Sequence, residues 1–319
     1  MKILFITATR VGDAVLSTGV LQHLLEENPN ARVTIVCGPA AAGLFEAVPR
    51  LEKIIVLSKK RWSMHWVDMW LACVGTFWDA VVDLRNAPIS YLLATHKSWH
   101  LGRKHMSVHR VARNGALLGM VNNPPTPKLW CTDDHKKTAE RLLPSGKPII
   151  AIAPVANWKP KSWSAENFVE LIKRLTSEAG VLPGAKVMVF GTQNEREQAS
   201  HVLENIPADQ MIDCMGTLSL LEIYACLKRS SLFVGNDSGL MHMAAAAGVP
   251  TLGLFGPSRE DLYSPWGDRA MFTRGDLDFA GVFPENYDYQ NADNLELMSG
   301  LTVDRVENAA TELWQRVGE

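Results

Sequence analysis

A polar segment in the last third of the chain combines residue types that can bind an anionic ligand. Within Leu232–Pro257, Asp237, Ser238 and Gly239 form a turn between a buried-strand pattern and an Ala-rich helix pattern, and His242 comes one turn into that helix. The N–H groups that begin a helix are unpaired and attract phosphate. Asp237 is itself anionic, so we expect it to bind a ribose hydroxyl or to cap the helix. An ordinary capped turn without a ligand is the alternative.

Two further loops of the same half carry a cation and a carboxylate. Lys161 follows the predicted strand Ile149–Ala153, where an ammonium group can neutralise a diphosphate, although plain solvent exposure explains a lysine there equally well. Glu195 follows the predicted strand Lys186–Phe190, where it can hydrogen-bond a ribose or stabilise a first helical turn. Taken together, these loops favour a site for a phosphorylated ligand in the second half.

The first half offers one carboxylate that can act as a general base. Asp13 lies between the predicted strand Lys2–Thr7 and the predicted helix Ala14–Glu27, and Gly12 lets a substrate approach it. A role as N-cap of that helix is the structural alternative. The loop lacks G-x-G-x-x-G, so the sequence does not predict a dinucleotide site of that kind.

Residues 84–132 contain no Asp or Glu, although the formal charge of the chain is −2. The cations of this stretch are Arg85, Lys97, Arg103, Lys104, Arg110, Arg113 and Lys128. Such a local bias predicts a patch for an anionic substrate, and a solvated basic face is the alternative. Arg85 directly follows the predicted strand Ala80–Leu84, so we expect it to face the ligand.

Strand and helix patterns alternate along the whole chain, which predicts doubly wound parallel sheets of the α/β class. With 319 residues the chain is longer than one core usually serves, so we expect a domain over residues 1–144, a second over 145–301 and a last helix within 302–319. The predicted linker begins at Pro144. The remaining predicted strands are Val33–Cys37, Ile54–Leu57, Leu232–Val234 and Thr251–Phe255, and the remaining helices Ala165–Glu178, Glu195–Glu204, Leu220–Lys228, Leu240–Ala247 and Val303–Val317.

Composition limits the classes of function. An apolar fraction of 47% with 21% charged residues is typical of a soluble globular protein, and the near-neutral balance argues against a dedicated nucleic-acid binder. Five scattered cysteines, never in C-x-x-C spacing, predict reduced thiols in a cytoplasm and neither a zinc site nor a disulfide framework. No signal peptide opens the chain, and the aromatic run Trp62–Trp78 is too short to span a bilayer.

Three motifs agree in order and spacing along the chain. They are R-V-G-D at Arg10–Asp13, K-S-W at Lys161–Trp163, and N-D-S-G-x-x-H followed by F-G-P within Asn236–Pro257. Together they resemble glycosyltransferase family nine, the ADP-heptose:lipopolysaccharide heptosyltransferases and their relatives. The resemblance implies a GT-B architecture, in which two Rossmann-like domains face a central cleft and the last helix packs back on the N-terminal domain.

The resemblance also implies an inverting, metal-independent transfer from a nucleotide sugar, with no cofactor. Asp13 matches the catalytic base and Lys161 the lysine that binds the donor diphosphate. The implied donor-binding residues are Asn157, Lys161, Glu195, Asp237, Ser238, Gly239 and His242, and the acceptor-binding residues that we expect are Arg10, Gly12, Arg85 and Arg103. Asn157 stands where the family often has a hydroxyl-bearing residue.

The leading hypothesis is transfer of heptose from ADP-heptose to a lipopolysaccharide core or a related glycolipid. A nucleotide-sugar epimerase of the same architecture and a non-catalytic nucleotide-sugar-binding protein are the alternatives. The expected partners are a nucleotide-sugar donor and an anionic glycolipid or saccharide acceptor, with no nucleic acid. We expect a cytoplasmic protein that touches the inner face of the membrane through the Trp62–Trp78 run and the basic stretch, although both can equally be core and solvated surface.

Overall fold

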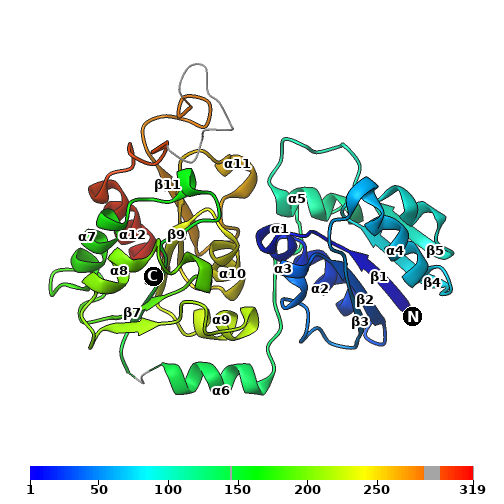
Figure 1. Ribbon diagram of the computed structural model, residues 1–319, viewed down its shortest axis with the longest axis horizontal. Helices are drawn as coiled ribbons and strands as arrows, with labels where there is room; N and C mark the ends of the chain where they lie inside the picture. Colours follow the sequence, from blue (N-terminus) through cyan, green and yellow to red (C-terminus); the bar gives the residue numbers. More distant parts are fainter. Residues whose placement is uncertain (144–145, 284–294, 319) are drawn as a thin grey trace. The chain divides into compact units, whose positions relative to one another are not determined.

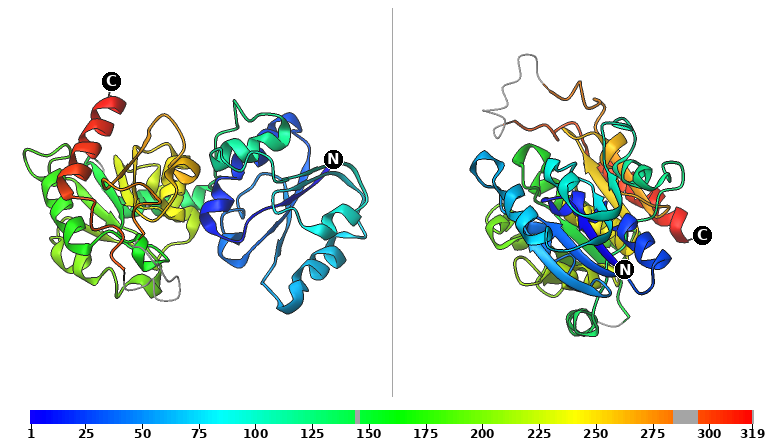
Figure 2. Two further views of the ribbon diagram at one scale, coloured as in Figure 1. Left: turned by 90° about the horizontal axis from the view of Figure 1, so that it is seen from above. Right: turned by 90° about the vertical axis from the view of Figure 1, so that its right-hand side faces the viewer.

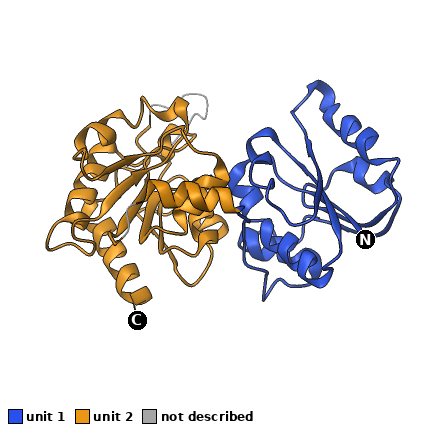
Figure 3. Ribbon diagram, turned by 90° about the horizontal axis from the view of Figure 1, so that it is seen from below, with its two compact units in different colours: residues 1–132 blue, residues 133–319 orange. Residues whose placement is uncertain are grey.

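The computed structural model describes residues 1–143, 146–283 and 295–318, and these divide into two compact units, 1–132 and 133–319 (Figure 3). The sequence predicts the boundary at residues 144 and 145, which lie outside the described residues. The structure places it twelve residues earlier because helix α6 (Asp133–Leu142) packs against α9 (Leu220–Leu227) of the second unit.

Unit 1 is a five-stranded parallel sheet with the strand order β3-β2-β1-β4-β5 (Figure 1). The order reverses between β1 and β4, whose carboxyl ends pair at Ile6 and Asp83. Ligands of open parallel sheets bind at such a reversal. The elements are β1 (Lys2–Ile6), α1 (Val11–Val15), α2 (Thr18–Glu27), β2 (Arg32–Cys37), α3 (Pro39–Ala42), β3 (Leu51–Val56), α4 (His65–Cys73), β4 (Trp78–Asp83), β5 (Thr95–His100) and α5 (Arg110–Gly115).

The first predicted helix is divided in two in the structure. The predicted range Ala14–Glu27 contains a break between α1 and α2, where the Ser17 hydroxyl donates to the carbonyl of Ala14 and the Thr18 hydroxyl to that of Val15, both at 2.7 Å. Hydroxyl groups that bond the preceding turn compete with the helical pattern. Because of this break, Asp13 lies inside a separate short helix.

Unit 2 is a six-stranded parallel sheet with the order β11-β10-β9-β6-β7-β8, and here the order reverses between β6 and β9. Helices α7, α8 and α12 lie on one side of the strands and α9 and α10 on the other (Figure 1). The elements are β6 (Ile149–Ala153), α7 (Ala165–Thr176), β7 (Lys186–Val189), α8 (Ser200–Asn205), β8 (Met211–Asp213), β9 (Leu232–Asn236), α10 (Gly239–Ala247), β10 (Thr251–Phe255), α11 (Glu260–Tyr263), β11 (Ala270–Arg274) and α12 (Val303–Gly318).

Helix α12 belongs to the core of unit 2. Its buried side chains Val306, Ala310 and Leu313 join the apolar cluster formed by α7 and the strands, and the helix contacts α7, β10 and β11. Figure 2 draws α12 in red at the C-terminal end of the chain. The resemblance implies instead that the last helix packs on the first domain. The apolar stripe of α12 packs against the core of unit 2, which accounts for the assignment of this helix to unit 2.

Within the described residues, no helix is both long and apolar enough to cross a lipid bilayer.

Candidate active site

The strand reversal of unit 2 brings Lys161 and Asp237 together. Strands β6 and β9 are paired neighbours, so the loop that follows each of them lies at the same point of the sheet edge. The Lys161 ammonium Nζ lies 2.6 Å from Asp237 Oδ2. The Asp237 side chain is only 9% exposed and that of Lys161 25%, so this pair is shielded from water on most sides.

His242 completes this cluster from the first turn of α10. Its Nε2 lies 3.9 Å from the second carboxylate oxygen of Asp237, and its side chain is 4% exposed. Asp237 therefore stands between a lysine and an imidazole that come from two different elements. Because the lysine ammonium has three donors and the carboxylate uses one, Lys161 can bind a phosphate oxygen while it stays next to Asp237.

Asn236 holds the two loops in this position, and the sequence did not single it out. Its Oδ1 accepts a hydrogen bond from the backbone N–H of Trp163 at 2.9 Å, and its Nδ2 donates to the carbonyl of Pro154 at 2.9 Å. One fully buried amide thus joins the end of β9 to both ends of the loop that carries Lys161. A buried, fully paired amide of this kind fixes geometry. Its position in the N-D-S-G motif, at the end of a buried strand, is the feature of the sequence that could have pointed to this role.

Ser238 is the N-cap residue of α10, but its side chain does not cap the helix. The hydroxyl is buried and has no hydrogen-bond partner among the described residues. Gly239 is the first residue of the helix, where N–H groups have no intrahelical partner. An unused hydroxyl beside unused backbone donors forms a set of groups that can bind an anion. The prediction that Asp237 caps this helix is not met, because its carboxylate is paired with Lys161.

The other two expected donor-binding residues lie on loops of the same sheet. Glu195 ends the 3-10 turn Gln193–Glu195 after β7, and its Oε2 accepts hydrogen bonds from the backbone N–H and the hydroxyl of Thr192 at 2.7 and 2.9 Å. This capping box is the structural role that the sequence left open for Glu195. Asn157 is exposed in the bend after β6.

In unit 1, the expected base lies in α1, directly after β1. Arg10 is the exposed N-cap residue, and Gly12 and Asp13 are half-buried in the first turn. Asp13 is therefore the third residue of α1 and not its N-cap, which corrects the alternative derived from the sequence. Gly38, which follows the neighbouring strand β2, approaches this loop closely, since a Cβ there would lie 2.6 Å from the Cα of Thr9.

The loop after β4 positions Arg85. The Arg85 guanidinium lies over the Trp66 ring, 4.7 Å from the ring centroid, which is close enough for a cation–π contact. Burial lowers the pKa of Arg85, and the nearby Asp83 carboxylate offsets part of that effect. Arg103 lies exposed in the turn after β5. Both arginines thus follow strands that end at the same sheet edge.

Asp83 organises this loop and is a second residue that the sequence did not single out. Its fully buried carboxylate accepts hydrogen bonds from the N–H of Ala87 and the hydroxyl of Ser90, both at 2.7 Å, and from the N–H of Arg85 at 2.8 Å. The His100 Nδ1 lies 3.7 Å away. The position of this aspartate at the end of a buried strand is the feature of the sequence that could have identified it.

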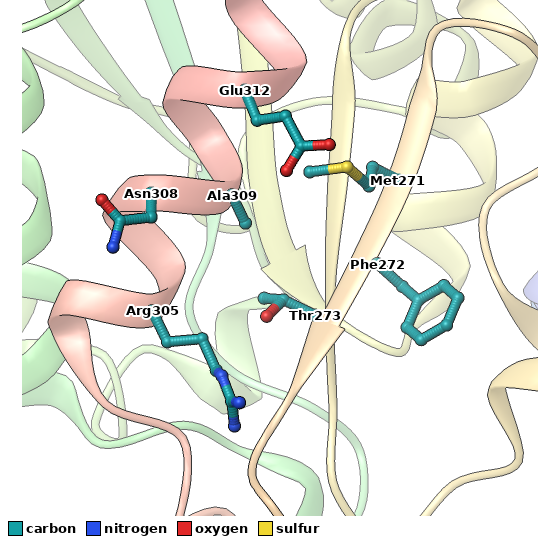
Figure 4. Close-up of a pocket in the computed structure, with 7 residues that line it drawn as sticks. All are labelled: Met271, Phe272, Thr273, Arg305, Asn308, Ala309 and Glu312. Atoms are coloured by element: carbon teal, nitrogen blue, oxygen red, sulfur yellow. The ribbon is translucent and has the colours of Figure 1, made fainter.

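A pocket of about 450 Å³ lies elsewhere in unit 2, along the edge strand β11 and helix α12 (Figure 4). None of the expected site residues lines it. The arginines of α12 close both ends of the strand edge, because Arg305 donates to the carbonyl of Arg274 at 3.1 Å and Arg316 to that of Ala270 at 3.0 Å. Phe272 points away from the helix (Figure 4). The pocket therefore lies where α12 covers the exposed edge of strand β11, and this structural role accounts for it.

The residues that the structure describes contain no cluster of three or more His, Cys, Asp or Glu side chains arranged to hold a metal ion. Asp276 and Asp278 form a D-x-D sequence, a pattern that can bind a metal ion, but both have local partners. Asp276 pairs with Arg305 at 2.7 Å, and Asp278 accepts a hydrogen bond from the N–H of Gly281 at 2.7 Å.

Comparison with known proteins identifies the class. The model of glycosyltransferase family 9 (heptosyltransferase) matches residues 87–282, which is more than half of the chain, so the protein belongs to this family. Together with the two parallel sheets, this defines an α/β protein of GT-B architecture.

Relatives of known identity and solved structures agree with this assignment. Lipopolysaccharide heptosyltransferase 2 of Salmonella typhimurium is 24% identical over 313 residues, covering 86% of this chain and 88% of the relative. The glycosyl transferase family 9 structure from Veillonella parvula superimposes with a TM-score of 0.78 at 21% identity, covering 98% and 97% of the two chains. The structure of E. coli ADP-heptose lps heptosyltransferase II gives a TM-score of 0.74 at 22% identity and covers both chains completely.

Proposed function

We propose that this protein is a heptosyltransferase that moves heptose from ADP-heptose to a lipopolysaccharide core or a related glycolipid, with inversion at the anomeric carbon. The observation that carries the proposal is the cluster of Lys161, Asp237 and His242 at the start of α10. Beside it lies the Ser238 hydroxyl, which has no partner in the part of the chain that the structure describes. The names of the relatives, lipopolysaccharide heptosyltransferase and ADP-heptose lps heptosyltransferase, support the choice of sugar, nucleotide and acceptor.

The donor half of the reaction requires charge neutralisation of a leaving diphosphate. When the bond between the anomeric carbon and the diphosphate oxygen breaks, the electron pair leaves with ADP. Lys161 and the first N–H groups of α10 lie in unit 2 where they can stabilise that charge without a metal ion or another cofactor. Asp237, Ser238, Gly239 and His242 would hold the ribose and the phosphates. Glu195 would contact the ribose, and Asn157 would lie near the phosphates.

The acceptor half requires a base. In the proposed reaction the Asp13 carboxylate takes the proton of an acceptor hydroxyl while that oxygen bonds to the anomeric carbon, and a single displacement inverts the configuration there. Arg10, Arg85 and Arg103 supply positive charge for an anionic glycolipid or saccharide, and Gly12 leaves room beside the base. We also propose that the enzyme works in the cytoplasm at the inner face of the membrane and that its partners do not include nucleic acid.

Substitution Asp13→Asn tests the proposal because it keeps the shape of the side chain and removes the base. We expect transfer from ADP-heptose to fall roughly 10²–10⁴-fold while the affinity for ADP, measured by calorimetry, stays the same. Glu27→Gln, at the exposed end of α2, is the matched control and should leave both quantities unchanged. Full turnover by Asp13→Asn would exclude Asp13 as the base, and conversion of the donor without any acceptor would identify an epimerase instead.

A further inference from the structure

Helix α4 of unit 1 is apolar on two sides, but only one side packs on a core. Met69 and Cys73 are fully buried against the sheet, with Trp66 and Trp70 packed beside them. The opposite side of the helix carries Met64, Leu71 and Val74, which are 49%, 64% and 39% exposed. Their spacing of seven and three residues places them on one face of the helix.

The segments on both sides of α4 carry further exposed apolar side chains. Trp62 precedes the helix and is 81% exposed, and Phe77 follows it and is 63% exposed. The backbone of Trp62 has a φ of 57°, a left-handed conformation that is costly for a large side chain. We call Trp62, Met64, Leu71, Val74 and Phe77 the α4 apolar surface. A group of large exposed apolar side chains of this kind marks an interaction site.

Positive charge borders the α4 apolar surface. Residues 53–67 contain no Asp or Glu, and Lys59, Lys60 and Arg61 immediately precede Trp62. Arg61 lies over the Trp62 ring at 5.3 Å from the centroid. Asp68 is the one acidic residue between positions 53 and 78, and Lys60 neutralises it at 2.7 Å. The surface therefore presents apolar side chains and cations without a free negative charge of its own.

We infer that the α4 apolar surface docks the protein on an anionic lipid bilayer. Trp62, Leu71 and Phe77 enter the boundary between headgroups and acyl chains, and Lys59 and Arg61 contact the anionic headgroups. A second copy of the chain fits less well, because a two-fold interface would set the same cations against one another. The inference deepens the proposed function, since a glycolipid acceptor lies in such a membrane, but the docking surface stands on its own observations.

Sedimentation with lipid vesicles tests the inference. We expect the protein to bind vesicles of phosphatidylcholine mixed with phosphatidylglycerol, less at high salt, and not to bind phosphatidylcholine alone. Leu71→Asp should lower the partition coefficient roughly tenfold or more, because a carboxylate would replace a leucine that enters the bilayer when the protein docks. Lys59→Gln combined with Arg61→Gln should lower it about fivefold for each charge removed.

Matched controls come from unit 2. Leu277→Asp changes a leucine that is 58% exposed, and Lys136→Gln with Lys137→Gln removes two exposed charges of α6, so neither variant should affect vesicle binding. The inference is overturned if the wild-type protein does not sediment with anionic vesicles, or if the controls lose binding as much as Leu71→Asp does. It is also overturned if the wild-type protein is a dimer that Leu71→Asp dissociates and vesicles do not bind it.

Transfer to a delipidated, water-soluble acceptor separates this inference from the proposed function. Leu71→Asp should keep its activity on that acceptor and an unchanged circular dichroism spectrum. If the wild-type protein binds vesicles and transfers no sugar, the docking surface stands and the proposed function fails. If the wild-type protein transfers sugar and does not bind vesicles, the proposed function stands and the docking surface fails.

Discussion

The pair of Lys161 and Asp237 shows how one residue can serve both stability and binding. The Asp237 carboxylate is nearly buried, so it needs the ammonium group to offset the loss of hydration. The same ammonium group lies beside the start of α10, where an anionic ligand would be held. A lysine that already neutralises a buried carboxylate is fixed in position before the ligand arrives, which lowers the entropic cost of binding.

We therefore predict that Lys161→Ala weakens both stability and donor binding. Loss of a hydrogen bond to a charged group should reduce the affinity for ADP roughly tenfold to a hundredfold and the free energy of unfolding by about 2 kcal/mol. Calorimetry and urea denaturation measure the two effects. Lys159→Ala, an exposed lysine of the same 3-10 turn, is the control and should change neither. Unchanged ADP affinity in Lys161→Ala would contradict the phosphate-binding role.

At the scale of secondary structure, the central strands could be predicted from the sequence and most edge strands could not. Strands β1, β6 and β9 are short runs of buried apolar residues, and such a run predicts a central strand of a parallel sheet from the sequence alone. Strand β5 has the sequence THKSWH and is largely exposed, and β8 has three residues. These strands exist because a neighbouring strand offers hydrogen bonds, which local composition does not reveal.

The residues at the strand ends were predicted, but the contacts that hold them were not. The motifs locate Lys161, Asp237 and Asp13 because polar residues gather in the segments that follow apolar strands. The pairing of Lys161 with Asp237 spans 76 positions of the sequence, and the links made by Asn236 and Asp83 depend on which strands are neighbours. Strand order therefore decides these contacts, and no local pattern fixes it.

The approach of two loops in unit 1 leads to a prediction at this scale. Gly38 follows β2, and a Cβ added there would lie 2.6 Å from both the Cα and the Cβ of Thr9. Gly38→Ala should therefore displace the segment that leads into α1 and Asp13, lowering stability by roughly 1–3 kcal/mol. A displacement near 1 Å should lower the transfer rate about a hundredfold, whereas ADP affinity should not change.

Gly75→Ala is the matched control, since nothing lies within 4 Å of the added carbon. Thermal unfolding and steady-state kinetics on one soluble acceptor compare the two variants. Equal rates for both variants would show that the β1 loop does not depend on the close approach of Gly38.

At the scale of the whole molecule, two separate cores suggest two units that open independently. The apolar cluster around α4 belongs to unit 1, and the cluster that joins α7 and α12 to the strands belongs to unit 2. Each unit has its own sheet and its own buried cysteines. Buried thiols become reactive only when the surrounding structure opens, so they report on each unit separately.

Thiol labelling with and without ADP tests this independence. Burial raises the pKa of Cys37 and Cys73 in unit 1 to about 11 and that of Cys214 in unit 2 to about 12, so these groups stay as unreactive thiols at neutral pH. Cys131, which is half-buried, should be labelled first. Peptide mass spectrometry after labelling gives a rate for each cysteine.

If unit 2 alone holds the nucleotide, ADP should protect only the cysteines of unit 2. At a ligand concentration near one hundred times the Kd, linkage adds about 2.7 kcal/mol to the stability of the binding unit, which slows its opening-limited labelling about a hundredfold. Cys214 and Cys226 should show this slowing, and Cys37 and Cys73 should keep their rates. Equal slowing of all four buried thiols would mean that the two units open as one cooperative body, and slowing of the unit 1 thiols alone would place the nucleotide in unit 1.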